Sequence, residues 1–106
     1  MVERGEYPGS KNVMGGLLYR EPTEKVIPGF WREAPLERGI VERGLWILTE
    51  DSGLKINFNS RKFGVEPYNC FTVLRAKFDK WFAGKVAQAG GLILTKTVVE
   101  DVIFHG

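Results

Sequence analysis

The chain has 106 residues, of which 43% are hydrophobic and 26% are charged, and its formal net charge is +2. This length fits one small domain with a thin core, and the composition is that of an ordinary globular protein. Acidic and basic residues are interleaved without a basic cluster, which argues against nucleic acid as a partner. No apolar run approaches the roughly 18 residues of a membrane span, so a cytoplasmic location is the default expectation.

The first five residues, MVERG, are typical of the end of a β-strand that presents an acidic side chain, Glu3. A dinucleotide-binding βαβ unit uses such a carboxylate to accept hydrogen bonds from ribose hydroxyls, with a Gly-rich turn and helix about 20 residues upstream. No such turn precedes Glu3, so we expect an internal piece of a nucleotide-binding enzyme. Two interpretations of Glu3 stay open: a ribose ligand, or an exposed acid near the start of the chain.

Residues 5–16 (GEYPGSKNVMGG) contain four glycines and one proline. That density disfavours regular structure and permits close approach of the backbone to another group. We predict an ordered loop, in which Gly15 and Gly16 either let backbone N–H groups approach a cofactor or only serve turns. Residues 21–35 contain three prolines, which limit this segment to one short helical turn. Phe30 and Trp31 are expected to fill the space beneath that turn.

Residues 39–60 are predicted to form a β-hairpin, because two apolar stretches flank a turn-forming segment at residues 50–53. In the second stretch Leu54, Ile56 and Phe58 alternate with polar residues, which predicts one covered and one solvated face. A short strand follows at residues 68–74. It contains Cys70, which we expect to be a buried, unreactive thiol.

Residues 74–89 give the clearest helix signal, with apolar residues at positions 74, 78, 81, 82 and 86. Two glycines at positions 90 and 91 are a typical left-handed C-terminal cap, and strands are predicted at residues 92–97 and 98–104. Arg75 stands where strand and helix meet. Its guanidinium either binds a phosphate or cofactor as a rigid fork of donors, or pairs with Asp79 one turn on. No catalytic triad, carboxylate pair or metal-ligand spacing occurs, so we assign no catalytic or metal-binding residue.

Taken together, the segments VERG, GSKNVMGG, LYREPTEKVIPGF, APLERGI, ILTEDSGLKINF and TVLRAKFDKWFAGKVAQAGGLILTKTVVEDVI resemble a known family. They are similar, in this order, to the region after the first βαβ unit of FixC-type flavoproteins. These are relatives of the electron-transfer flavoprotein–quinone oxidoreductases in the wider geranylgeranyl-reductase group. The resemblance covers residues 2–103, and KNVMGG, IPGF and VLRAKFDKW are its most specific parts.

The resemblance implies an α/β fold (α+β within these residues), as part of a glutathione-reductase-like, FAD-binding Rossmann domain with a β-hairpin from the substrate domain. Residues 1–20 would hold the end of a Rossmann strand and the cofactor loop. Residues 21–70 would form the helical turn and the substrate-side hairpin. Residues 71–106 would supply a strand, a helix and strands that return to the FAD domain.

FAD is the implied cofactor, with Glu3 on its adenosine ribose. The other implied FAD-binding residues are Arg4, Met14, Gly15, Gly16, Leu17 and Arg75. The family's GxGxxG strand–turn–helix, whose helix N-terminus binds the pyrophosphate, is absent from these residues. We therefore expect them to bind FAD weakly or not at all on their own, and to self-associate through open sheet edges.

The implied function is that of an FAD-dependent oxidoreductase that passes electrons between an electron-transfer flavoprotein and a quinone or ferredoxin-like acceptor. Its chemistry would belong to the flavin, and these residues alone are expected to be inactive. The location would be cytoplasmic, either free or peripheral at the inner membrane face. One alternative is a geranylgeranyl-reductase-like enzyme that reduces isoprenoid double bonds, which would need a long apolar tunnel. Another is a cofactor-free structural or interaction domain, which would be a colourless monomer with a closed sheet.

Overall fold

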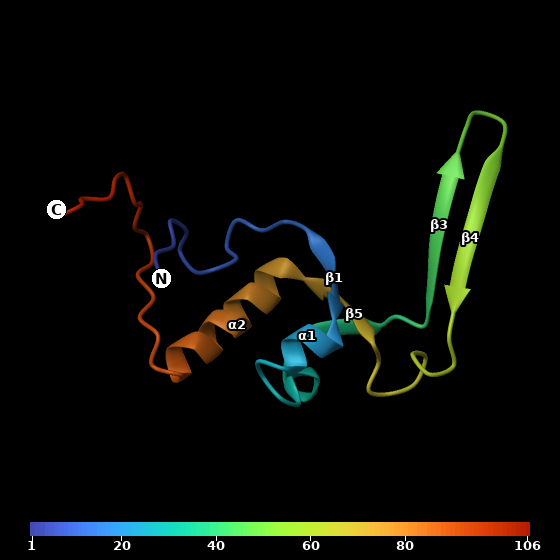
Figure 1. Cartoon of the computed structure of the whole chain (residues 1–106), viewed down its shortest axis with the longest axis horizontal. Helices are drawn as coiled ribbons and strands as arrows, with labels where there is room; N and C mark the ends of the chain where they lie inside the picture. Colours follow the sequence, from blue (N-terminus) through green and yellow to red (C-terminus); the bar gives the residue numbers. More distant parts are fainter. The chain divides into compact units, whose positions relative to one another are not determined.

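The computed structural model describes all of residues 1–106 and divides the chain into two compact units. Unit 1 consists of Met1–Gly16 and Leu74–Gly106, and unit 2 of Leu17–Val73. The elements in chain order are β1 (Gly15–Tyr19), α1 (Arg20–Glu24), the 3-10 helix η1 (Phe30–Arg32), β2 (Leu36–Gly39), β3 (Glu42–Leu48), β4 (Gly53–Asn59), β5 (Cys70–Leu74) and α2 (Arg75–Gln88) (Figure 1). This mixture of helices and strands confirms the predicted α/β class at that level.

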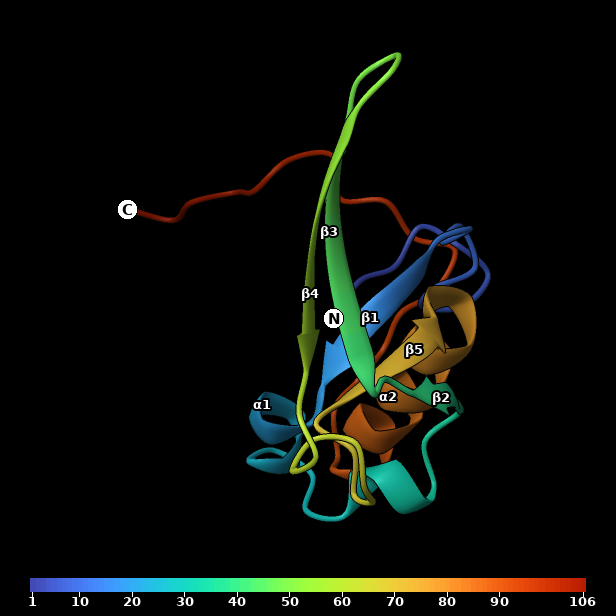
Figure 2. The ribbon, with the colours of Figure 1, turned by 90° about the vertical axis from the view of Figure 1, so that its right-hand side faces the viewer.

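The first sheet has three strands in the order β1-β5-β2 (Figure 2). At the two ends of the β1–β5 pair, Arg20 N–H donates to the Asn69 carbonyl at 2.9 Å and Arg75 N–H donates to the Met14 carbonyl at 3.1 Å. Residue 14, just before β1, is thus bonded to residue 75, and residue 20, just after β1, to residue 69, so the two strands run antiparallel. β2 also pairs antiparallel with β5, with Gly39 opposite Phe71. The predicted strand at residues 68–74 is thus confirmed.

Two features of this sheet differ from the sequence-based expectations. Gly15 and Gly16 open β1, so the prediction that the loop extends through them is wrong. Pairing with β5 holds these glycines in extended backbone despite their low strand preference. β2 was not predicted, because its four residues, LERG, carry three polar or glycine residues and no strand pattern. Backbone pairing with β5 holds these four residues in a strand instead.

The core of unit 2 is small and lies around β5. Phe30 and Cys70 are completely buried, and Phe71 and Val73 are nearly so. The burial of Cys70 confirms one prediction. The short helical turn α1 confirms another in part, because η1 adds a second helical turn to a segment that was expected to hold only one. Phe30 fills space as expected, whereas Trp31 is only half-buried. Trp31 lines an open pocket instead of plugging the core, so the prediction for that residue is wrong.

The second sheet is the predicted hairpin, in which β3 and β4 pair antiparallel from Glu42 opposite Asn59 to Leu48 opposite Gly53. Its turn is closed by Thr49 N–H, which donates to the Ser52 carbonyl at 2.8 Å. The Asp51 carboxylate accepts hydrogen bonds from the hydroxyls of Ser52 at 3.0 Å and Thr49 at 3.1 Å. These bonds, that from Ser52 most strongly, lower the pKa of Asp51 below its ordinary value of 3.8.

The hairpin has no covered face, so that part of the prediction is wrong. Every residue of β4 is exposed. Five apolar side chains share one face of the hairpin through their cross-strand pairing, and each is 55–60% exposed. We call this surface the apolar hairpin face; it consists of Leu45, Ile47, Leu54, Ile56 and Phe58. The alternation of apolar residues selects one face, but covering it requires another element to pack there.

In unit 1, the predicted helix and its glycine cap are confirmed as α2 and the residues after it. Gly90 adopts a left-handed φ of 89°, and Gly91 N–H donates to the Val86 carbonyl at 2.9 Å. Phe78 is buried on this helix, with ring-centre distances of 5.5 Å to Trp81 and 6.0 Å to Phe82. The apolar stripe read from the sequence therefore forms an aromatic cluster on one face of α2.

The residues after α2 pair in parallel with the start of the chain. Val2 and Leu94 form a parallel β-bridge, flanked by hydrogen bonds from Glu3 N–H to the Leu94 carbonyl at 2.8 Å and from Leu94 N–H to the Met1 carbonyl at 3.0 Å. The strand predicted at residues 92–97 is reduced to this bridge. The strand predicted at residues 98–104 is wrong: the segment is exposed and irregular, because no partner strand pairs with it.

None of the helices combines the length and the apolar character needed to cross a membrane.

Candidate functional site

The parallel bridge fixes the position of Glu3, whose side chain is 29% exposed. Oε1 of Glu3 accepts a hydrogen bond from Gly5 N–H at 2.5 Å and lies 3.9 Å from Nζ of Lys11. Gly5 is buried, and a Cβ atom there would stand 2.1 Å from the Ser10 hydroxyl oxygen, so the loop closes tightly around the carboxylate. Oε2 has no protein partner. The arrangement leaves one carboxylate oxygen able to accept hydrogen bonds from an external hydroxyl.

The glycine-rich loop is attached to the first turns of α2. The side-chain amide of Asn12 donates to the Asp79 carboxylate. Gly9 has a φ of 95°, and a Cβ at that position would lie 2.8 Å from the Cβ of Asp79. Only glycine satisfies both the left-handed backbone and this close approach. The loop is therefore ordered, as predicted, although the sequence reasoning missed Asn12 because a single amide in a loop carries no distinctive pattern.

Arg75 is paired with Asp79, which is the second of the two alternatives left open by the sequence. Nε and Nη2 of Arg75 each donate to an Asp79 carboxylate oxygen at 3.0 Å. These hydrogen bonds, together with the charge of Asp79, raise the pKa of Arg75. The Arg75 side chain is nevertheless half exposed, and a two-point contact holds the guanidinium plane in one orientation. The pairing uses Nε and Nη2 and leaves Nη1 of Arg75 without a protein partner.

The structure brings some of the predicted FAD-binding residues together. Arg75 N–H donates to the Met14 carbonyl at 3.1 Å, so these two residues are neighbours. Glu3 instead contacts four other residues: Gly5, Lys11, Leu94 and Thr97. The glycine-rich loop links both groups, because Lys11 approaches Glu3 while Asn12 binds Asp79.

Most of the remaining predicted residues are exposed. Arg4 is exposed, and so are Gly15 and the side chain of Met14, whereas Gly16 is half-buried. Leu17 is 57% exposed and belongs to unit 2. Gly15 and Gly16 are in β1 and pair with β5, and the Met14 carbonyl accepts the bond from Arg75, so part of this backbone is already hydrogen-bonded within the protein.

Comparison with known proteins gives the chain its family. The fold and the site define a mixed α/β protein in which the partly exposed carboxylate of Glu3 follows a parallel β-bridge. It is 46% identical over 101 residues to "Protein FixC" of Bradyrhizobium diazoefficiens, which covers 95% of this chain and 23% of that protein. It is 44% identical over 105 residues to "Protein FixC" of Azotobacter vinelandii, covering 99% of this chain and 24% of that protein.

A third relative is "Probable electron transfer flavoprotein-quinone oxidoreductase YdiS" of Escherichia coli (strain K12), 34% identical over 106 residues, which are 100% of this chain and 25% of that protein. No family model matches the chain. The chain belongs to the FixC-type family, which confirms the resemblance seen in its sequence. It spans about a quarter of the length of these relatives.

Proposed function

We propose that these residues form part of the FAD-binding region of an oxidoreductase that passes electrons between an electron-transfer flavoprotein and a quinone or ferredoxin-like acceptor. The observation that carries the proposal is the parallel bridge between Val2 and Leu94, with Glu3 directly after it. Parallel strands need a crossover connection, usually a helix, and α2 ends just before Leu94. A carboxylate at the end of such a strand is the ribose ligand of a Rossmann domain.

The geometry of unit 1 supports separate roles for its residues in binding different parts of FAD. Glu3 would accept hydrogen bonds from the adenosine ribose through Oε2, with Arg4 beside it. Met14, Gly15 and Gly16 would approach the cofactor nearer the flavin through backbone groups, and Leu17 follows them in the chain. Arg75, oriented by Asp79, would add charged donors. When bound, the flavin supplies the electron-transfer chemistry, and these residues bind and orient it.

A chimera tests this proposal. The corresponding quarter of Azotobacter vinelandii FixC, which matches 99% of this chain, is replaced by residues 1–106. We expect the purified chimera to carry flavin, measured by absorbance, and to be reduced by electron-transfer flavoprotein. A folded chimera that is colourless and takes up no added FAD would contradict the proposal.

The same chimera tests Glu3. The substitution Glu3→Gln removes the charge from the ribose hydrogen bonds and should weaken FAD binding by about tenfold or more, since charge-assisted bonds contribute about 1.5–3 kcal/mol. Glu6→Gln, an exposed acid in the same loop, is the matched control and should leave FAD affinity unchanged. Equal affinities in both variants would remove Glu3 from the site while leaving the flavin assignment intact.

We further propose that the protein works on the cytoplasmic side, peripheral at the inner membrane face, where a quinone acceptor resides. The apolar hairpin face supports this location, since its five side chains are each 55–60% exposed.

Flotation with lipid vesicles tests the location. The double substitution of Leu54→Lys and Ile56→Lys should abolish binding to the vesicles, and Asn57→Lys on the opposite face should preserve it. A different result would contradict this location: the unsubstituted protein does not float with the vesicles and forms oligomers, and the double substitution dissociates them. The apolar hairpin face would then pair with a second copy of the chain.

A further inference from the structure

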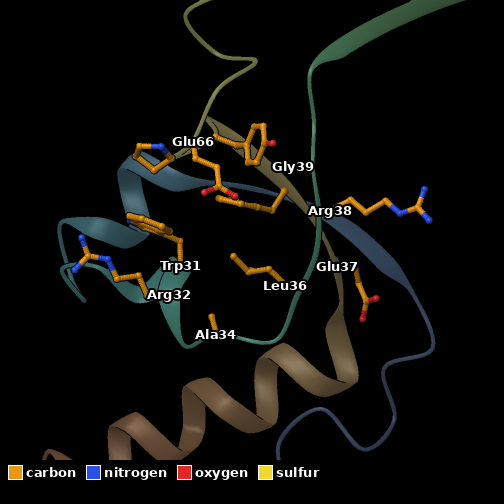
Figure 3. A pocket seen from close by; sticks show the side chains of 11 residues that line it. Trp31, Arg32, Ala34, Leu36, Glu37, Arg38, Gly39 and Glu66 are labelled. Carbon is orange, nitrogen blue, oxygen red and sulfur yellow. The ribbon is translucent and has the colours of Figure 1, made fainter.

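An open pocket of about 280 Å³ lies beside the edge strand β2 in unit 2 (Figure 3). Aromatic and aliphatic side chains of Trp31 in η1, Leu36 in β2, Tyr68 and Phe71 form one part of its lining. The rest includes four charged residues: Arg32, Glu37, Arg38 and Glu66. None of these residues belongs to the proposed FAD region. The volume is just below the range of about 300–1,000 Å³ typical of small-molecule sites, so the pocket suits a small group.

One wall of the pocket is held in a fixed orientation. The Tyr68 ring lies directly over Gly39, where an added Cβ would come within 2.3 Å of two ring atoms. The Phe71 ring meets Tyr68 edge-on at a centre distance of 6.0 Å, and Phe71 is itself buried in the core. Since Gly39 supports one side of Tyr68 and Phe71 another, this aromatic wall exists before any ligand arrives.

The polar lining has one inward-pointing charge. Figure 3 shows the Glu66 carboxylate pointing into the ring of lining side chains, whereas the side chains of Arg32, Glu37 and Arg38 extend away from it. Glu66 makes no hydrogen bond or ion pair, and the Tyr68 hydroxyl is likewise without a partner. A carboxylate only accepts hydrogen bonds, and a tyrosine hydroxyl can accept them as well.

We propose that this pocket binds a primary ammonium group carried on an apolar stem. The aromatic walls attract a cation through their π faces, and the Glu66 carboxylate accepts its N–H donors. An anionic ligand would be repelled by the Glu66 carboxylate, because the lining arginines Arg32 and Arg38 extend away from the pocket. A neutral ligand would gain no attraction from that charge.

Three probes of the same size test the charge preference: benzylamine, which is a cation at neutral pH, benzyl alcohol and benzoate. Binding to the full chain is followed by NMR shifts of the Trp31 indole N–H and the Glu66 and Tyr68 amides. We expect benzylamine to bind about tenfold more tightly than benzyl alcohol, a difference of about 1.4 kcal/mol, and benzoate to bind least. Equal binding of all three probes, tighter binding of benzoate, or no binding of benzylamine would overturn the proposal.

Two charge-matched variants locate the effect. Glu66→Gln keeps the size of the side chain and should reduce the preference for benzylamine to less than about twofold. Glu37→Gln removes the same charge from a residue that points away from the pocket, and should keep the preference. If Glu37→Gln abolishes the preference and Glu66→Gln does not, the assigned carboxylate is wrong.

The ammonium could come from a free amine or from a lysine side chain of a partner protein. The tripeptide Ala-Lys-Ala, with blocked ends, is therefore compared with butylamine, which has the same stem and charge. Tighter binding of the tripeptide indicates a lysine of a partner protein, and tighter binding of butylamine indicates a small amine. Both results support the ammonium site, while binding of neither overturns it.

Discussion

Strands β5 and β4 are both antiparallel, and both contain apolar residues, yet their surroundings are opposite. β5 is the central strand of its sheet, and Cys70, Phe71 and Val73 are buried. β4 is one half of a two-stranded hairpin in which every residue is exposed. An isolated hairpin is marginally stable, because it lacks a packed hydrophobic face. The difference shows that apolar residues stabilise a strand only where a second layer covers them.

The largest expected effect comes from the same substitution in both strands. Phe71→Ala, at 7% exposure, should lower the free energy of unfolding by about 3–5 kcal/mol, because it leaves a cavity in the core. Phe58→Ala, at 57% exposure, should cost less than about 1 kcal/mol. Urea denaturation of the two variants measures both values. Similar losses of unfolding free energy in the two variants would mean that the apolar hairpin face is covered in solution. The contrast between a buried β5 and an exposed β4 would then be wrong.

A pair of glycine substitutions should give effects of intermediate size and opposite sign. Gly39→Ala pushes a methyl group against the Tyr68 ring, 2.3 Å away, and should destabilise the protein by about 1–3 kcal/mol through overpacking. Gly84→Ala, on the exposed side of α2, has no atom within 4 Å of the new methyl group. It should stabilise the helix by up to about 1 kcal/mol. Thermal unfolding followed by circular dichroism compares them, and a stabilising Gly39→Ala would show that Tyr68 moves freely.

The sequence predicted best those elements whose bonds are local. The helix α2 with its glycine cap and the β3–β4 hairpin each follow from side-chain period and turn residues within one segment. β2 and the irregular C-terminal residues were predicted wrongly because their state depends on a partner elsewhere in the chain. β2 forms on β5 despite a polar sequence, whereas residues 98–104 have an apolar, strand-like sequence and no partner.

The candidate site was predictable to a similar extent. The pairing of Arg75 with Asp79 follows from their spacing of one helical turn. The parallel pairing that positions Glu3 joins residues 2 and 94. No local sequence pattern predicts a contact between residues so far apart in the chain. Asn12 and Glu66 escaped notice for the same reason, since the partner of Asn12 and the pocket around Glu66 come from distant segments. The assignment of FAD to these residues stays a prediction.

The smallest expected effect is a pH dependence confined to the hairpin turn. The Ser52 and Thr49 hydroxyls lower the pKa of Asp51 in the folded hairpin, so the ionised carboxylate stabilises the turn. This contribution is fully present above the ordinary pKa of 3.8 and is lost as the pH falls through the lower, folded value. Amide exchange at Ser52, taken relative to its intrinsic rate at each pH, should therefore accelerate in that range. Exchange in β5, taken in the same way, should not change, because its protection comes from burial. Asp51→Asn removes the titration and is the control; acceleration of equal size in this variant would assign the effect to general acid unfolding.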